Sequence, residues 1–162
     1  MTHRLLPATI VATALSGVVL PPAAHAAGPL AVTSTVMVES KVRGTDGTTR
    51  VVLTPARRVV PGDRVVLTLA YQNNGTQPLS NIAFDNPVPK GLAYRNAAPG
   101  SAAPQVSVDG RTFGALASLR VPTAGGGWRA AQPDDVTHVR WRLDRPLSAG
   151  AKGQFAFQAV LK

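Results

Sequence analysis

The sequence predicts an all-β protein, an antiparallel β-sandwich of about seven to nine strands, and three observations support this prediction. After residue 27 helical periodicity is nearly absent, and short runs of alternating apolar and polar residues follow one another. Gly, Pro, Asn and Asp separate these runs at the spacing typical of sandwiches and barrels. Many runs have one face that is only half polar, which favours two sheets packed face to face.

The first two strands form a predicted hairpin. Apolar and polar residues alternate over residues 30–42, where the valines mostly stand at even-numbered positions, and the alternation resumes over residues 48–54. Between them lies Asp46-Gly47, a strong signal for a tight hairpin turn. Residues 55–61 begin and end with proline, which cannot donate a hydrogen bond to a central ladder. We therefore expect a loop or edge segment there.

Residues 64–73 give the clearest strand pattern in the chain, and apolar residues occupy one of its faces and half of the other. This predicts a central, well-covered strand. A turn follows at Asn73-Asn74-Gly75, where we expect Asn73 and Gly75 to tolerate a positive φ. Residues 79–85 then return as a strand, and the two prolines of residues 87–92 predict a rigid crossing segment.

The middle of the chain is rich in small residues and turn signals. Residues 96–104 predict a loop, and residues 105–108 and 111–113 flank Asp109-Gly110 as a second hairpin. Residues 114–133 predict a long loop with one short strand near residues 118–121. Trp128 in this loop has two interpretations: it caps the edge of the core, or it is an exposed contact residue.

Two further strands complete the predicted sandwich. In residues 136–143 the apolar side chains of Val139 and Trp141 point one way, and His138, Arg140 and Arg142 point the other way. Residues 153–161 form the last strand, with two phenylalanines on one face.

The first 26 residues predict an export signal. Arg4 precedes the apolar residues 5–20, and Ala24-His25-Ala26 is a small-x-small cleavage pattern. We expect cleavage between Ala26 and Ala27, which leaves one domain, residues 27–162, in the periplasm, at the cell surface or outside the cell. A retained N-terminal anchor is the alternative; no later stretch is apolar enough to cross a bilayer.

The composition narrows the classes of function. The chain has 17 Lys and Arg against 8 Asp and Glu, a formal net charge of +9. Outside the cytoplasm this charge favours acidic proteins, anionic polysaccharides or lipid head groups as partners and makes nucleic acid a poor candidate. The alternative is that the charge only keeps the protein soluble and has no specific partner. The chain has no cysteine, which excludes disulfides, thiolate nucleophiles and attachment of lipid to cysteine.

Residues 69–92 carry a resemblance to a known family. A strand ends near Asn73-Asn74-Gly75, a second strand leads to Asp85, and Pro89-Lys90-Gly91-Leu92 follows. The pattern resembles the conserved-repeat domain of bacterial surface proteins, catalogued as domain of unknown function eleven, and the likeness covers residues 59–162. The resemblance implies an immunoglobulin-like sandwich, usually exported, without established catalysis. This chain departs from the family in having a single copy and a longer insertion at residues 115–133.

The sequence contains no recognisable catalytic or metal-binding constellation. His138 is the only histidine after the predicted cleavage site, Glu39 is the only glutamate, and most aspartates stand in turns, where they bond the local backbone. A zinc site needs several His or Cys ligands, and a calcium site needs six or more oxygens. The sequence therefore predicts no enzyme, cofactor or metal; a pocket combining aspartate with His138 is the alternative.

Two functions follow as expectations. The first is a non-enzymatic structural, adhesion or protein-interaction module of the bacterial cell envelope, with an unknown envelope protein as partner. The alternative is a binding module for an anionic glycan or lipid head group, with His138, Arg140 and Arg142 as contacts, because arginine binds phosphate and carboxylate groups bidentately. A solvated sheet face explains the same residues without any ligand. The oligomeric state stays open.

Overall fold

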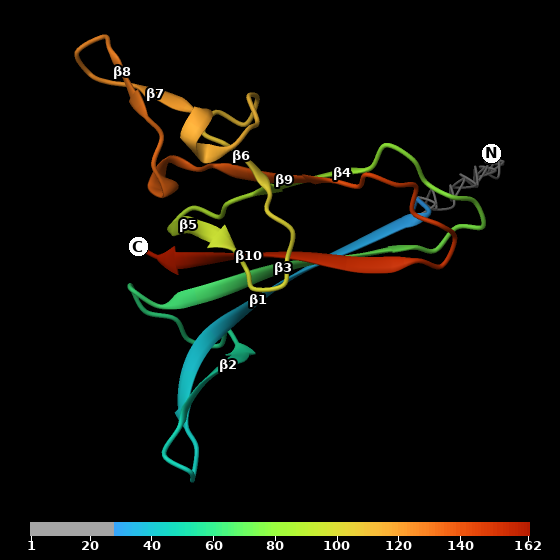
Figure 1. Ribbon diagram of the computed structural model, residues 1–162, viewed down its shortest axis with the longest axis horizontal. Coiled ribbons are helices and arrows are strands. Elements are labelled where there is room, and N and C mark those ends of the chain that lie inside the picture. The colour runs from blue at the N-terminus through green and yellow to red at the C-terminus, as the bar shows by residue number, and fades with distance from the viewer. Residues whose placement is uncertain (1–27) are drawn as a thin grey trace, which may run out of the picture.

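The computed structural model describes residues 28–162, an all-β protein built from antiparallel sheets (Figure 1). The expected export signal, with its cleavage pattern at Ala24 and Ala26, lies outside the described residues. These residues form ten strands and two single-turn 3-10 helices, and they contain no α-helix. None of their helices has the length and apolar character needed to cross a bilayer.

The larger sheet has five strands in the order β2-β1-β3-β10-β5. Their bounds are β1 Leu30–Arg43, β2 Thr49–Pro55, β3 Arg64–Asn73, β5 Leu92–Ala97 and β10 Lys152–Leu161. The predicted central strand is confirmed with the same bounds, since β3 lies in the middle of the sheet and pairs with β1 and β10 along almost its whole length.

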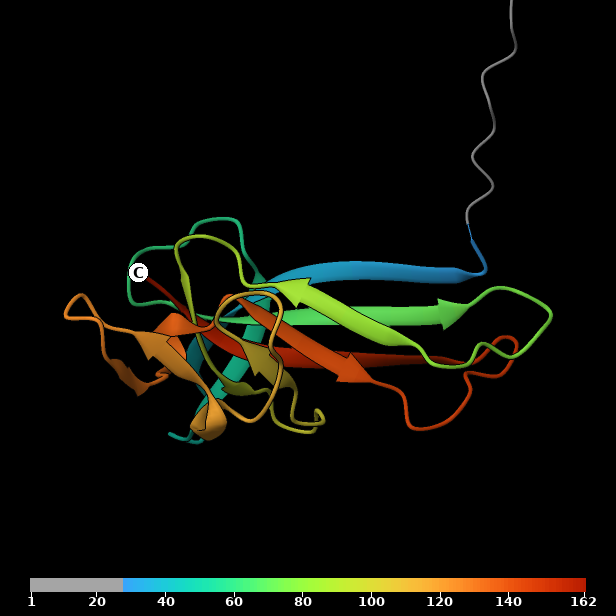
Figure 2. The same cartoon turned by 90° about the horizontal axis from the view of Figure 1, so that it is seen from above.

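The second layer is a three-stranded sheet in the order β4-β9-β6. Its strands are β4 Ala83–Pro87, β6 Gln105–Ser107 and β9 His138–Arg142. Figure 2 shows β4 and β9, in light green and orange, crossing over β3 and β10 of the larger sheet. A separate hairpin joins β7 Arg120–Pro122 to β8 Trp128–Ala130, and the 3-10 helices are η1 Leu116–Ser118 and η2 Pro133–Asp135.

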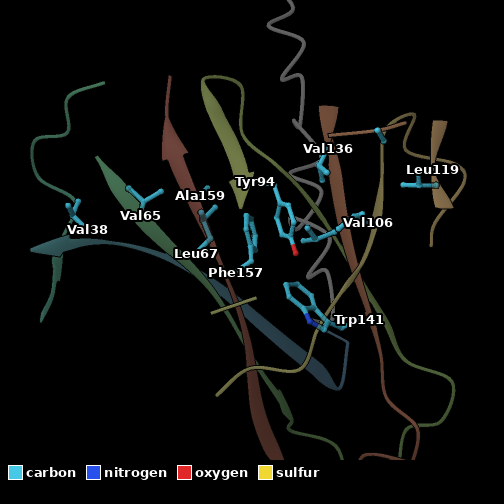
Figure 3. Packing of buried hydrophobic residues seen from close by; sticks show 12 residues of the cluster. Val38, Val65, Leu67, Tyr94, Val106, Leu119, Val136, Trp141, Phe157 and Ala159 are labelled. Atoms are coloured by element: carbon cyan, nitrogen blue, oxygen red, sulfur yellow. The ribbon is translucent and has the colours of Figure 1, made fainter. Parts of the chain in front are cut away.

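The core lies between the two layers and is built from alternate residues of the facing strands (Figure 3). Leu67 and Phe157 enter it from the larger sheet, and Val106, Val139 and Trp141 enter it from the smaller one, each at most 6% exposed. The stacking of side chains from the two sheets makes the architecture compatible with a β-sandwich.

Asn73 closes one end of this core and is fully buried. Its Nδ2 donates to the carbonyl oxygens of Gln77 at 2.8 Å and Leu147 at 2.9 Å, and its Oδ1 accepts from the N–H of Gly75 at 2.9 Å. The expectation of a positive φ at Asn73 and Gly75 is wrong, because neither residue adopts one. A glycine fits position 75 for another reason: a Cβ there would lie 2.7 Å from Cβ of Pro29.

The structure differs from the predicted elements at several places. The described residues form ten strands, more than the expected seven to nine, because residues 114–133 hold the hairpin β7–β8 and not a loop with one short strand. The strand expected over residues 79–85 is observed as β4, Ala83–Pro87.

Strand β5 falls where a crossing segment and a loop were expected, because Ala93 and Tyr94 are both buried and a bulge at Gln158/Ala159 shifts the pairing register. Residues 111–113 form no strand. The carboxylate of Asp109 accepts from the N–H groups of Arg111 and Thr112, each at 2.8 Å, which ties this segment to the turn.

Candidate interaction surfaces

The predicted anion contacts lie together on the outer face of β9. His138, Arg140 and Arg142 alternate along the strand with Val139 and Trp141, which are buried. Because successive strand residues point to opposite faces, all three polar side chains leave the sheet away from the core. The structure therefore brings the three residues to one face, as the alternation predicts.

Arg140 is held by groups within the protein. Its Nε and Nη2 donate to the two carboxylate oxygens of Asp85, at 2.5 and 2.6 Å, and its guanidinium carbon lies 3.5 Å from the centroid of the Phe113 ring. These hydrogen bonds lower the pKa of Asp85 below its ordinary value, and the charges of Arg140, Arg142 and His138 lower it further. An external anion therefore competes with Asp85 for Arg140.

The other two residues differ in their surroundings. Nδ1 of His138 lies 3.0 Å from the hydroxyl of Thr137, and its ring packs so closely on Gly110 that a Cβ there would lie 3.0 Å from Cε1. Arg142 is exposed at the end of β9 and lines a shallow pocket together with Arg140 and Asp144. The outer face of β9 thus carries carboxylates beside its positive charges. Anion binding stays a prediction, and Arg142 is the residue that we now expect to make the main contact.

A second surface is formed by the β1–β2 hairpin, residues 39–55, which extends away from the sandwich in Figure 1. The pairing of β1 with β3 ends at Val38, so the last five residues of β1 pair with β2 and not with β3. All seven residues of β2 are exposed. The exposed apolar residues of the hairpin are Val42 at 50%, Val51 at 60%, Val52 at 37% and Leu53 at 48%.

The turn of this hairpin is fixed by local chemistry. Asp46 Oδ1 accepts from the N–H of Thr48 at 3.0 Å and from its hydroxyl at 2.7 Å, and these bonds lower the pKa of Asp46. Gly47 adopts a φ of 79°, which glycine reaches without a steric penalty. The Asp-Gly signal in the sequence therefore predicts this hairpin correctly.

A third surface is the β7–β8 hairpin, residues 120–130, which projects from the side of the molecule opposite to the β1–β2 hairpin in Figure 1. Of the two interpretations of Trp128, the structure supports exposure, since 70% of the residue is accessible. The base of the hairpin is anchored: both terminal nitrogens of Arg129 donate to Asp135, at 2.6 and 2.7 Å, and with a bond from the Gln132 N–H they lower the pKa of Asp135 to about 2.

Sequence reasoning missed the exposure of the β1–β2 hairpin. Alternation shows which side chains share a face, but it does not show whether another layer covers that face. The three consecutive apolar residues at positions 51–53, followed by Pro55, are the available signal, because they suit an edge strand without a clear solvent face.

Among residues 28–162 there is no cluster of three or more histidine and carboxylate side chains placed to hold a metal ion. A comparison with protein-family models, with curated proteins and with solved structures found no match to this chain. The three surfaces are therefore the features of the molecule that can support a function.

Proposed function

We propose that the protein is an exported, non-enzymatic domain of the bacterial cell envelope that acts by contact with other proteins, in a structural or adhesive role. The observation that carries this proposal is the exposed apolar surface of the β1–β2 hairpin. Exposed apolar side chains lie on both faces of this hairpin, and exposed apolar surface gathered in one region of a soluble domain marks a site of interaction. Covering Val51 or Leu53 gains about 1–2 kcal/mol each by the removal of apolar area from water.

Two further features support the proposal. Trp128 stands at the β7–β8 hairpin, and tryptophan is enriched among the residues that dominate protein interfaces. The pattern of residues 1–26 supports export. Two antiparallel sheets around one core support the finer assignment to an immunoglobulin-like sandwich, related to the single conserved-repeat domain that residues 69–92 resemble.

The test compares two charged variants of the tagged protein in cells. Val51→Lys with Leu53→Lys places two charges on the hairpin, and Thr76→Lys with Gln77→Lys places the same two charges on an exposed turn elsewhere. After crosslinking and purification, we expect the unmodified protein and the turn variant to retain the same protein neighbours, and the hairpin variant to lose them. Equal recovery with all three proteins would contradict a role of the hairpin, and so would the absence of any specific neighbour.

A second candidate function is binding of an anionic glycan or lipid head group. The exposure of Arg142 beside Arg140 favours it. This binding depends on surface charge and is therefore screened by salt. Its test is retention on an anionic matrix at low salt.

A further inference from the structure

Four strands lie at the edges of the two larger sheets, and three of them are protected. Helix η2 packs against β5, and Arg95 on β5 bonds Asp134 of that helix at 2.8 Å. Strand β6 has three residues, and Val106 in it pairs with Gly114. Strand β4 has five residues and ends at Asp85-Asn86-Pro87. Short length, charge, proline and a covering segment are the usual protections of a sheet edge.

The fourth edge, β2, has seven residues, and all of them are exposed. Its central residues are Val51, Val52 and Leu53, and Arg50 is its only charged residue. Within the described part of the chain β2 pairs with β1 alone. An apolar edge of this length offers a template for pairing with another strand.

The direction of the backbone groups of β2 follows from the hairpin turn. The N–H of Gly44 donates to the carbonyl oxygen of Thr48 at 2.7 Å. Hydrogen-bonded and non-hydrogen-bonded pairs alternate along an antiparallel ladder, so Arg50, Val52 and Thr54 direct their backbone groups toward β1. The N–H and C=O groups of Val51 and Leu53 consequently point outward from the sheet.

We propose that β2 pairs with β2 of a second copy of this chain, antiparallel, with the two Val52 residues opposite each other on a two-fold axis. In this register Val51 lies opposite the partner's Leu53, and each such pair exchanges two backbone hydrogen bonds. The proposal rests on the proposed function, because it names the partner of the same hairpin.

The sequence of β2 is self-complementary in this register. Val51 and Leu53 of both copies meet on one face of the joined sheet, and the two Val52 side chains meet on the other. Arg50 lies opposite the partner's Thr54, so no like charges face each other across the pair. A register centred on position 50 would place two arginines opposite each other, and one centred on position 51 would place Leu53 opposite threonine.

Proline sets the limit of the pairing. Pro55 lies opposite the partner's Thr49 and has no N–H to donate, so the ladder ends there. The contact is therefore short, and short edge contacts belong among the small interfaces of weak complexes. We expect dimers that form and dissociate with protein concentration.

The test uses the absence of cysteine from the chain, so that one introduced cysteine is the only thiol. Residues in a non-hydrogen-bonded pair have Cα atoms about 4.5 Å apart, within the range that a disulfide bridges. Val52→Cys meets this condition across the two-fold axis. Thr54→Cys is the matched control, because the two copies of position 54 lie about 13 Å apart along the strands.

We expect purified, C-terminally tagged Val52→Cys to form covalent dimers under mild oxidation at least about tenfold faster than Thr54→Cys, because paired thiols react as neighbours. Equal rates for the two variants overturn the proposal. Val52→Lys places two charges on the axis, so we also expect sedimentation to show a mass that rises with concentration for the unmodified protein and stays monomeric for this variant.

The outcomes separate the two proposals. If the hairpin variant Val51→Lys with Leu53→Lys loses its envelope neighbours while the unmodified protein is monomeric at all concentrations, the proposed function stands and self-pairing is overturned. If dimers form, but the hairpin variant recovers the same envelope neighbours as the unmodified protein, self-pairing stands and the hairpin binds only a second copy of this chain. If the unmodified protein is monomeric at all concentrations and the hairpin variant keeps its envelope neighbours, both proposals are overturned.

Discussion

Replacing Asn73 tests how the end of the sandwich is held together. The side chain is fully buried and joins three segments, the end of β3, the turn at Gly75 to Gln77, and Leu147. Asn73→Ala removes three hydrogen bonds, each worth about 1 kcal/mol net. It also leaves the Leu147 carbonyl in buried surroundings with one partner fewer.

We expect Asn73→Ala to lower the free energy of unfolding by about 2–4 kcal/mol, a large part of the 5–15 kcal/mol typical of a domain. Asn73→Asp keeps the shape of the side chain but removes the amide donor, and at neutral pH it places a carboxylate against two carbonyl oxygens. It is therefore also expected to destabilise the protein. This variant separates the loss of the donor from the loss of volume.

The assay is urea unfolding followed by fluorescence and circular dichroism, with Asn74→Ala as the control. Asn74 is exposed, so its replacement is expected to change the unfolding free energy by less than about 0.5 kcal/mol. If Asn73→Ala and Asn74→Ala unfold at the same urea concentration with the same slope, the buried amide does not hold this end of the fold.

Three further predictions concern the core, the acid range and the basic face. Phe157→Ala is expected to lower the unfolding free energy by about 3–5 kcal/mol, because Phe157 is 0% exposed between the sheets; a loss below 1 kcal/mol in urea unfolding would contradict this packing. The pKa of Asp135 is lowered to about 2, so its contribution to stability is complete above its ordinary pKa near 4 and is lost as pH falls through 2. Asp135→Asn should therefore weaken the dependence of the unfolding free energy on pH over this range. An unchanged pH dependence of the unfolding free energy would refute this prediction. On an anionic matrix at low salt, Arg142→Ala should elute earlier and Asp85→Asn, which frees Arg140, should elute later; unchanged elution of Arg142→Ala counts against the anion site.

Alternation predicts the central strands well, because both of their faces are constrained. The bounds of β3 match the expected ones, and the outward direction of Arg140 beside the buried Val139 follows from the same pattern. The turn chemistry of Asp46-Gly47 likewise predicts the first hairpin. These features are local, so a single sequence contains the information for them.

The features that escape prediction depend on contacts between distant segments. Strand β5 breaks the alternation because its pairing with β10 contains a bulge, and Arg140 is held by Asp85, which lies 55 positions earlier in the chain. The exposure of Val51 depends on whether a distant segment covers its face of the hairpin, and within the described residues none buries it. None of these three facts is visible in the residues concerned taken alone.

Hydrogen exchange of the β2 amides, followed by NMR at two protein concentrations, tests the role of this strand most directly. In dilute protein we expect slow exchange for the N–H groups of Arg50, Val52 and Thr54, which face β1, and fast exchange for those of Val51 and Leu53. At high concentration Val51 and Leu53 are predicted to become protected. Protection of Val51 and Leu53 already in the dilute monomer would contradict a role of β2 as a contact edge. Equally fast exchange of both amides at every concentration, with and without envelope partners, would contradict it as well.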